Sequence, residues 1–411
     1  MIRRLLPTLL AFLILGAAPA AAKDAADEIF LTKTITVRWL PDGRQALRVR
    51  TERRLLTDFA VRRLSDPRIR YDASLQELTI HAHRVRTPDG GEVIAPDYAV
   101  NESQGDGIGN TTDFAAVVDR VATQVGAQRG AVLVLDYEII DREPFRPALD
   151  LALSLGEASP VERLEVTVTV PGEIPLHWAL SPTHEALRPV ESRAEDGARI
   201  LHILGTDLPA FPREPGAGDP TPRLLASTWI EWKAPLEHLD AALAAAFEGR
   251  AGCGLPDVLA AAVEGHGLPA VFKALRAGLR IVHGPLPRGG FVPRPVCRAW
   301  ESGYATPLEA ALVLATATVG NGSGGVTLST GAAVFVQEVP GLAQWTEVLG
   351  WIHSNPDGLG ALFWTPASDT VRDHVPNLQG SYSYRFNRTH PPRALPTRLR
   401  MRPPERPVES P

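Results

Sequence analysis

The stretch "ESGYATPLEAALVLATA", residues 301–317, has the form of a helix entrance. Thr306 suits the N-cap, Pro307 suits the first helical position, and Glu309 completes a capping box three residues after the cap. Reactive cysteines can occupy such an entrance, where the helix dipole and free N–H groups lower the pKa of a thiol. The candidate position here is Ala305, which carries no reactive group. Apolar residues follow on one helical face: Leu308, Ala311, Leu312 and Ala315.

Length and charge set the broad class of the chain. It has 411 residues, 44% of them hydrophobic, which predicts a globular protein with more than one domain. The formal net charge of -5 argues against bulk binding to nucleic acid. Two glycine-rich stretches, residues 102–114 and 320–325, lack the strand-then-helix context of a phosphate loop, so we interpret both as loops and expect no cofactor.

The N-terminus predicts a secretory signal peptide. Arg3 and Arg4 precede an apolar run over residues 5–15, and small residues follow up to Ala22. The run is shorter than the ~20 apolar residues of a membrane-spanning helix. We therefore expect cleavage after Ala22, a periplasmic or secreted bacterial protein, and no transmembrane segment in the mature chain.

Two cysteines, Cys253 and Cys297, fall in the part of the chain expected to be exported. Disulfides form and persist in oxidising compartments, and the cysteine count is even. We expect one disulfide between them. The alternative is a free catalytic thiol at Cys297.

Residues 31–232 alternate in the manner of β-strands. Alternating runs flank the turn sequences "PDG" at 41–43 and "PDGG" at 88–91, which are hairpin signals. Runs rich in Val, Ile and Leu follow at 130–140 and 164–180, with turn residues at short spacing. This pattern predicts an antiparallel β-sandwich.

The pattern changes to helices after residue 233. Residues 236–249 and 269–282 each place apolar side chains on one helical face, and the opening stretch supplies a third helix. Helices followed by strands predict an α+β second domain. The expected apolar strands lie at 325–339, 345–353 and 360–366.

These signals divide the chain into four segments of an α+β protein. We expect a signal peptide at 1–22, a β-sandwich domain at 23–232 and a helix-then-sheet domain at 233–386. Residues 387–411 form a tail rich in proline and arginine.

The order of these elements resembles a known family. Four stretches carry the likeness: "PDGGEVIAPDYAVN" (88–101), "GAVLVLDYEIIDREPFRP" (130–147), "ASPVERLEVTVTVPGEIPL" (158–176) and "SGYATPLEAALVL" (302–314). Residues 31–386 resemble bacterial proteins in which a β-sandwich of unknown function, domain-of-unknown-function family 3857, precedes a transglutaminase-like (papain-related) domain.

The resemblance implies a catalytic triad, and this sequence lacks its members. Such enzymes need a thiolate, a histidine that takes its proton and an acid that orients the histidine. Ala305 stands at the cysteine of a Gly-x-Cys entrance, and "AQWTEV" puts Ala343 at the histidine. "FWTPASD" puts Thr365 where an Asp-Pro pair would supply the acid. The resemblance therefore implies a degenerate site.

Two other sets of residues could carry chemistry. Cys297, His353 and Asp369 form a conceivable relocated triad, which would need a free thiol. His81 and His83 alternate in "TIHAHRV" with a spacing that suits a metal, but no third ligand accompanies them, so we expect no metal site.

The leading hypothesis is a secreted or periplasmic non-catalytic protein, a pseudoenzyme. It would bind a protein or a cell-envelope peptide in the cleft that holds the active site in enzymes of the family. The first alternative is a cysteine hydrolase or acyltransferase that uses Cys297. The second is an adhesion or assembly module that acts through the β-sandwich.

Overall fold

We describe the protein from a computed structural model of the whole chain. The structure describes residues 26–211, 221–248, 253–254, 257–258, 268–282, 292–316, 324–330, 334–353, 361–367, 370–372, 382–386 and 397–398. The expected signal peptide and most of the expected tail lie outside these residues.

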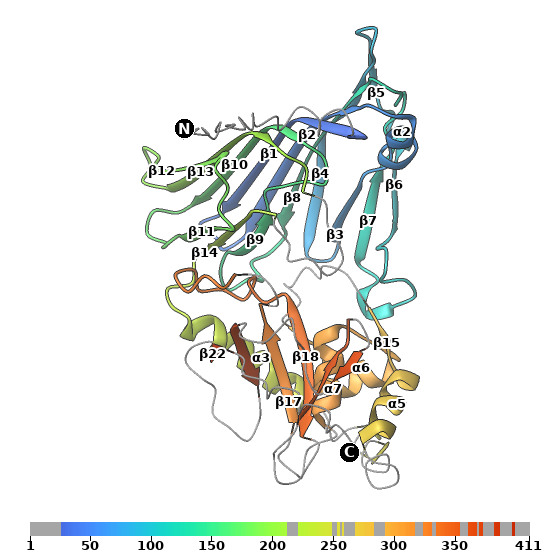
Figure 1. The fold of residues 1–411 in the computed structure, drawn as a ribbon, viewed down its shortest axis with the longest axis vertical. Coiled ribbons are helices and arrows are strands. Elements are labelled where there is room, and N and C mark those ends of the chain that lie inside the picture. Colours follow the sequence, from blue (N-terminus) through green and yellow to red (C-terminus); the bar gives the residue numbers. More distant parts are fainter. Residues whose placement is uncertain are drawn as a thin grey trace, which may run out of the picture.

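An eight-stranded sheet forms the largest layer of the molecule (Figure 1). In spatial order its strands are β12 (Leu187–Arg193), β13 (Arg199–Leu208), β10 (Val161–Val170), β1 (Glu28–Trp39), β2 (Gln45–Leu55), β8 (Val132–Asp141), β4 (Gln76–Arg86) and β5 (Glu92–Ile94). The two predicted hairpins are confirmed, because β1 pairs with β2 and β4 pairs with β5, both antiparallel.

One pairing in this sheet differs from the prediction of an antiparallel sandwich. Strand β1 pairs in parallel with β10, so that Ile35 lies opposite Val166 and Val37 opposite Val168. A parallel pair requires a long crossover connection, which here comprises the whole chain between the two strands. Alternate residues of β10 are fully buried, as period-two alternation requires.

Two three-stranded sheets complete the β-rich domain, the part of the chain up to β14. Their strands are β11 (His177–Ser181), β14 (Arg223–Ser227) and β9 (Asp150–Ser154), and β3 (Arg68–Asp72), β7 (Val117–Ala122) and β6 (Val100–Gln104). Leu224 of β14 packs with Val166 and Leu201 of the large sheet in one apolar core. Short helices α2 (Asp58–Leu64), η1 (Asp97–Ala99) and η2 (Thr112–Phe114) lie between the strands.

The C-terminal domain, the part from α3 onward, combines α-helices with a six-stranded sheet (Figure 1). The helices are α3 (Lys233–Glu248), α5 (Leu268–Gly278), α6 (Val296–Glu301) and α7 (Pro307–Thr316). The sheet order is β20 (Thr370–Arg372), β19 (Ala361–Thr365), β18 (Glu347–His353), β17 (Gly324–Ser329), β21 (Tyr382–Phe386) and β22 (Thr397–Arg398). Strands β15 (Arg280–Ile281) and β16 (Tyr304–Ala305) form a separate parallel pair.

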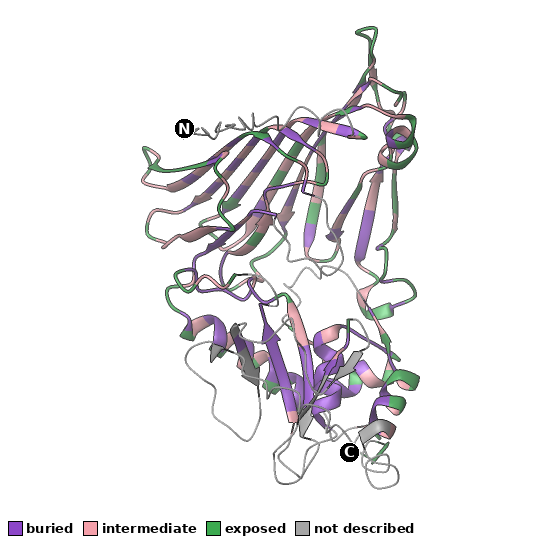
Figure 2. Ribbon diagram, in the orientation of Figure 1, coloured by how far each residue is buried: buried purple, intermediate pink, exposed green. Residues whose placement is uncertain are grey.

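Helix α7 lies at the centre of this domain. Every residue from Leu308 to Thr316 is buried (Figure 2), although the sequence suggested only one apolar face. A helix that is apolar on all sides belongs inside a core. Gly350 of β18 makes the close packing possible, because a Cβ there would lie 2.7 Å from Leu314 Cδ2.

The α+β class predicted from the sequence is therefore confirmed, with strands dominating the N-terminal part and helices joining them after α3. Within the described residues, no helix has both the length and the apolar character needed to span a membrane.

Candidate functional site

Helix α7 begins at the entrance that the sequence predicted, and its capping box is present. Thr306 N donates a hydrogen bond to Glu309 Oε2 at 2.8 Å, and Glu309 N donates to Thr306 Oγ1 at 3.2 Å. Glu309 is only 2% exposed, so the box lies inside the protein. Two backbone N–H groups at the helix start are thereby satisfied.

Arg294 neutralises the buried carboxylate of Glu309. Its Nε and Nη2 atoms donate to the two carboxylate oxygens, each at 2.9 Å, in a bidentate pair. Nη2 also donates to the carbonyl oxygen of Tyr304 at 2.7 Å. The guanidinium lies 4.7 Å from the ring centroids of both Phe114 and Tyr304. A paired charge and two aromatic rings therefore occupy the space beside the helix entrance.

Asp113 joins this cluster from the β-rich domain. Its carboxylate accepts hydrogen bonds from Arg294, from Arg298 Nε at 3.1 Å and from Tyr304 Oη at 3.0 Å. Burial acts to raise the pKa of Asp113, but the bonds from Arg298, Tyr304 and Arg294 outweigh it and hold the pKa below its usual value. The cluster therefore connects the two domains through an ionised carboxylate.

Ala305 follows Tyr304 of this cluster and belongs to the core. It is fully buried in β16, and its carbonyl oxygen accepts a hydrogen bond from Val282 N at 2.8 Å. Its methyl group belongs to the apolar core of the C-terminal domain. The position offers neither a nucleophile nor space filled by solvent.

The other two degenerate positions lie near the same core. Ala343 precedes β18, and Thr365 is the last residue of β19. The apolar cluster that contains Ala305 also contains their immediate neighbours, Leu342 and Trp364. Ala305 and these two neighbours therefore share one apolar core, and the assignment of the three positions to a former active site stays a prediction.

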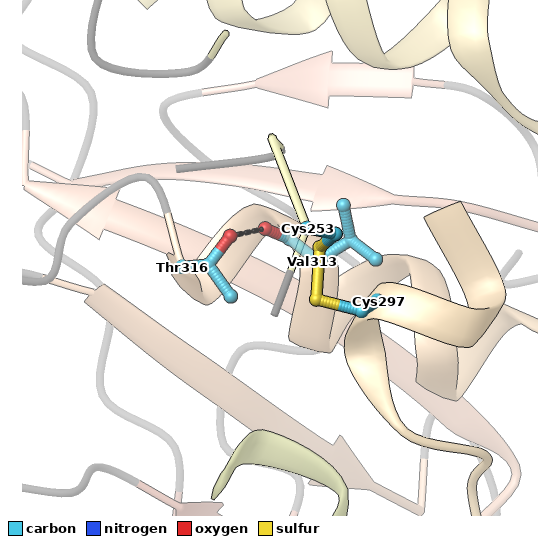
Figure 3. The surroundings of a disulfide bond; sticks show 4 residues. All are labelled: Cys253, Cys297, Val313 and Thr316. Carbon is cyan, nitrogen blue, oxygen red and sulfur yellow. Dashed lines mark hydrogen bonds between the residues drawn. A yellow bond between two sulfur atoms is a disulfide. The ribbon is translucent and has the colours of Figure 1, made fainter. Parts of the chain in front are cut away.

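The predicted disulfide is present (Figure 3). Cys253 and Cys297 are bonded, with their Cα atoms 5.5 Å apart, next to Val313 and Thr316 at the end of α7. No free cysteine exists in the chain. Cys297 therefore carries no thiol for the relocated triad.

His353 is the last residue of β18, and Asp369 lies outside the described residues.

His81 and His83 do not form a metal site together. The pairing of β4 with β8 shifts between Ile80 and Ala82, which leaves His81 as the extra residue of a bulge. The bulge breaks the alternation, so that His81 is exposed beside Glu138 while His83 is buried. Among the described residues, no group of three or more His, Cys, Asp or Glu side chains is placed to hold a metal ion.

A cavity of about 340 Å³ opens at the junction of the two domains. This volume is within the range of small-molecule and peptide side-chain sites. Ala343, which the resemblance places at the histidine of such enzymes, is part of its wall. The full lining is Phe145, Arg146, Pro147, Ala148, Asp150, Trp229, His238, Val292, Leu342 and Ala343.

Asp150 is the acidic group of this cavity. Its Oδ2 accepts a hydrogen bond from Leu342 N at 2.6 Å, and its Oδ1 accepts one from Ala343 N at 3.2 Å. Protein atoms surround the carboxylate closely, and this burial raises the pKa of Asp150 to about 6, against the lowering effect of the two N–H groups and of Trp229. At neutral pH the group is mostly ionised, but at an energetic cost.

Gly341 allows Asp150 to approach the backbone of the C-terminal domain. A Cβ at Gly341 would lie 2.5 Å from Asp150 Oδ1. The missing side chain lets the carboxylate sit over the N–H groups of the next two residues. The wall of the cavity is therefore itself an interdomain contact.

Sequence reasoning missed the groups that build this junction. Asp113 lies in the stretch 102–114, which we interpreted as a plain loop, and Asp150 begins an ordinary strand. The hydrogen-bond partners of Asp113, and the backbone N–H groups that bond Asp150, are more than 180 residues away in the chain. No local pattern could have identified them.

Comparisons with known proteins agree with this architecture. Residues 41–212 match the family described as "Domain of Unknown Function with solved-structure structure (DUF3857)", which confirms that part of the resemblance. The fold is similar to the crystal structure of a "putative protease" from Parabacteroides distasonis, with a TM-score of 0.72. The two sequences are 24% identical, over 84% of this chain and 71% of that chain, so the likeness shows the fold alone. No curated protein matches the chain.

Proposed function

We propose that the chain is an exported, non-catalytic member of the transglutaminase-like group that binds an extended peptide segment of a protein or cell-envelope partner. One observation carries the proposal. The helix entrance, where the nucleophile of such an enzyme would stand, holds a buried alanine in an apolar core, and both cysteines of the chain are bonded to each other. Thiol chemistry has no group to perform it.

The interdomain cavity supports the binding part of the proposal. It is concave, its walls are mainly apolar, and a second cavity of about 410 Å³ shares Pro147, Ala148 and Trp229 with it. Two adjoining hollows that share one tryptophan suit two side chains of an extended peptide. The peptide would lie along the seam between the domains.

Export is part of the proposal. The charged and apolar N-terminus, the small residues before Lys23 and the disulfide together favour an oxidising compartment. Expression in a Gram-negative bacterium tests this. We expect the periplasmic fraction to contain a protein that begins at Lys23, and a product retained in the cytoplasm with Met1 or Ile2 at its start would contradict it.

The binding test uses a pool of lysine-free, unstructured octapeptides with a fluorescein group at the C-terminus. We expect the wild-type protein to raise the fluorescence anisotropy of the pool and to leave every peptide mass unchanged after overnight incubation. Release of shorter peptides that persists in repurified protein would establish a hydrolase and overturn the proposal.

A matched pair of variants locates the binding surface. Ala148→Trp fills the seam shared by the two cavities, whereas Ile94→Ser with Tyr98→Ser removes two residues that are 74% and 80% exposed on the β-rich domain. We expect the first variant to lose binding and the second to keep it. The reverse result would favour the alternative of an assembly module that acts through the sandwich.

A further inference from the structure

We propose that the interdomain cavity binds a primary ammonium group, supplied by the free amino terminus of an extended peptide. The inference rests on the proposed function in one respect, namely that the cavity is the peptide-binding site. It adds the chemistry by which the site recognises one end of its ligand.

The first argument is the charge inside the cavity. Arg146 is already paired, because its Nε donates to Asp141 at 3.2 Å and its guanidinium lies 4.5 Å from the ring centroid of Phe145. Burial lowers the pKa of His238, so this side chain is neutral at pH 7. Asp150 has only backbone N–H groups and the indole of Trp229 around it, and no basic side chain of the described part pairs with it. Counted over the residues that the structure describes, the cavity therefore holds one uncompensated negative charge.

An uncompensated carboxylate in such surroundings favours a cationic ligand. A buried charge is costly unless a counter-charge and hydrogen bonds compensate it. Each oxygen of Asp150 accepts one backbone hydrogen bond and keeps further lone-pair capacity. A donor with several N–H groups, such as an ammonium, can use that capacity.

The walls identify an organic cation in preference to a metal ion. Asp150 is the only carboxylate among the described residues that line the cavity, whereas Ca²⁺ takes six to eight oxygen ligands. The remaining walls include the rings of Phe145 and Trp229 and the aliphatic side chains of Val292 and Leu342. Aromatic rings attract an ammonium through cation–π interactions, and apolar walls accept the carbon chain that carries it.

The position of the carboxylate suits a peptide terminus. Asp150 is held against the backbone at Leu342 and Ala343, at the wall of the cavity shared with the C-terminal domain. From there the second cavity continues past Trp229 toward Ile230, which is 76% exposed. A peptide whose ammonium contacts Asp150 can therefore extend along the seam and leave it at an open surface.

The experiment compares three octapeptide pools with the intact protein. The first has free amino termini and no lysine, the second is the same pool with acetylated termini, and the third is acetylated but carries one lysine at a varied position. We expect the first pool to bind at least tenfold more tightly than the second. Equal binding of the first two pools overturns the inference and leaves the proposed function intact, whereas no binding of any pool overturns both.

The third pool separates the two sources of a primary ammonium. If it binds as tightly as the first, the site recognises any primary ammonium group, and the proposal that it recognises the amino terminus is wrong. If it binds like the second, the terminus is the recognised group.

Two sets of variants test the role of charge. Asp150→Asn keeps the shape of the side chain, and we expect it to abolish the preference for free amino termini. Because this residue also contacts the C-terminal domain, Val292 supplies a second test at a cavity position that is 43% exposed. We expect Val292→Asp to strengthen and Val292→Lys to weaken binding of the first pool, each at least threefold, with the acetylated pool unchanged. Identical effects on both pools would contradict recognition of a cation.

Discussion

At the scale of single residues, the pKa values of two carboxylates at the domain junction are shifted from that of an ordinary aspartate in opposite directions. Asp113 has a lowered pKa, because bonds from two arginines and a tyrosine outweigh its burial. Asp150 has a pKa raised to about 6, because burial outweighs two N–H groups and an indole. Protonation of Asp113 therefore destabilises the folded protein, whereas protonation of Asp150 stabilises it.

The pH dependence of stability should reveal Asp150. Its folded-state pKa lies above the unfolded value, so its stabilising contribution is fully present below about pH 3.9 and is lost as the pH rises through about 6. We expect the melting temperature of the wild type, relative to Asp150→Asn, to rise as the pH is lowered from 7 to 4.5, which corresponds to a gain of about 2 kcal/mol in the free energy of unfolding. Calorimetry at both pH values checks this. A constant difference would show that the carboxylate titrates normally.

Removal of Glu309 should be costly. Glu309→Ala leaves the guanidinium of Arg294 without its bidentate partner and opens the capping box of α7. We expect a loss of about 3–5 kcal/mol in the free energy of unfolding, the range for breaking a buried ion pair. Urea denaturation measures it, with the exposed Glu301→Ala on α6 as the matched control. Similar losses in the two variants would mean that the pair contributes little.

At the scale of elements, local signals in the sequence were sufficient to predict helix α7 but not the segments that pack around it. Thr306, Pro307 and Glu309 lie within four residues, so their capping geometry could be predicted and is confirmed. The hairpin turns are equally local. The expected strand over 325–339 ends at Ser329 instead. Farther along that stretch, Val336 N bonds the side chain of Gln344, a partner that no alternation pattern indicates.

The contact between α7 and β18 should tolerate no added volume. Gly350→Ala would place a methyl group 2.7 Å from Leu314 Cδ2 and 3.4 Å from Ala311 Cα, inside a fully buried interface. We expect a loss of about 1–3 kcal/mol in the free energy of unfolding. Gly109→Ala is the control, because a Cβ there meets no atom within 4 Å.

A second substitution tests whether the loss is steric. Leu314→Ala alone should destabilise the protein by creating a cavity. Combined with Gly350→Ala, it should cost less than the sum of the two single changes. Additive losses would show that the methyl group does not meet Leu314.

At the scale of the whole molecule, the sequence predicted two kinds of structure and one disulfide but not how the domains meet. Alternation and helical periodicity are properties of short windows, and the α+β class follows from them. The three positions named from the resemblance stay a prediction, and of them Ala305 belongs to the apolar core of the C-terminal domain. The cavity could not be predicted, because it exists only when residues near 150, 230 and 342 come together.

The cluster around Asp113 should couple the unfolding of the two domains. In Asp113→Asn, Arg294, Arg298 and Tyr304 lose a shared ionic acceptor, at a cost of about 2–3 kcal/mol for hydrogen bonds to a charged group. We expect differential scanning calorimetry to show two separated transitions in this variant and closer transitions in the wild type. Asp106→Asn, at an exposed position of the same loop, serves as the control. An unchanged profile would mean that the domains unfold independently of this contact.

The parallel pairing of β1 with β10 has a consequence for the order of folding. β1 is an inner strand of the large sheet, with β2 on one side and β10 on the other. A ribosome that adds about 5–20 residues per second needs on the order of ten seconds to reach β10 after β1 has emerged. During that interval one edge of β1 has no partner, and an unpaired edge can add a strand from another chain. We therefore expect newly made protein to depend on chaperones until β10 closes the sheet, and late truncations that remove β10 to aggregate more than those that spare it.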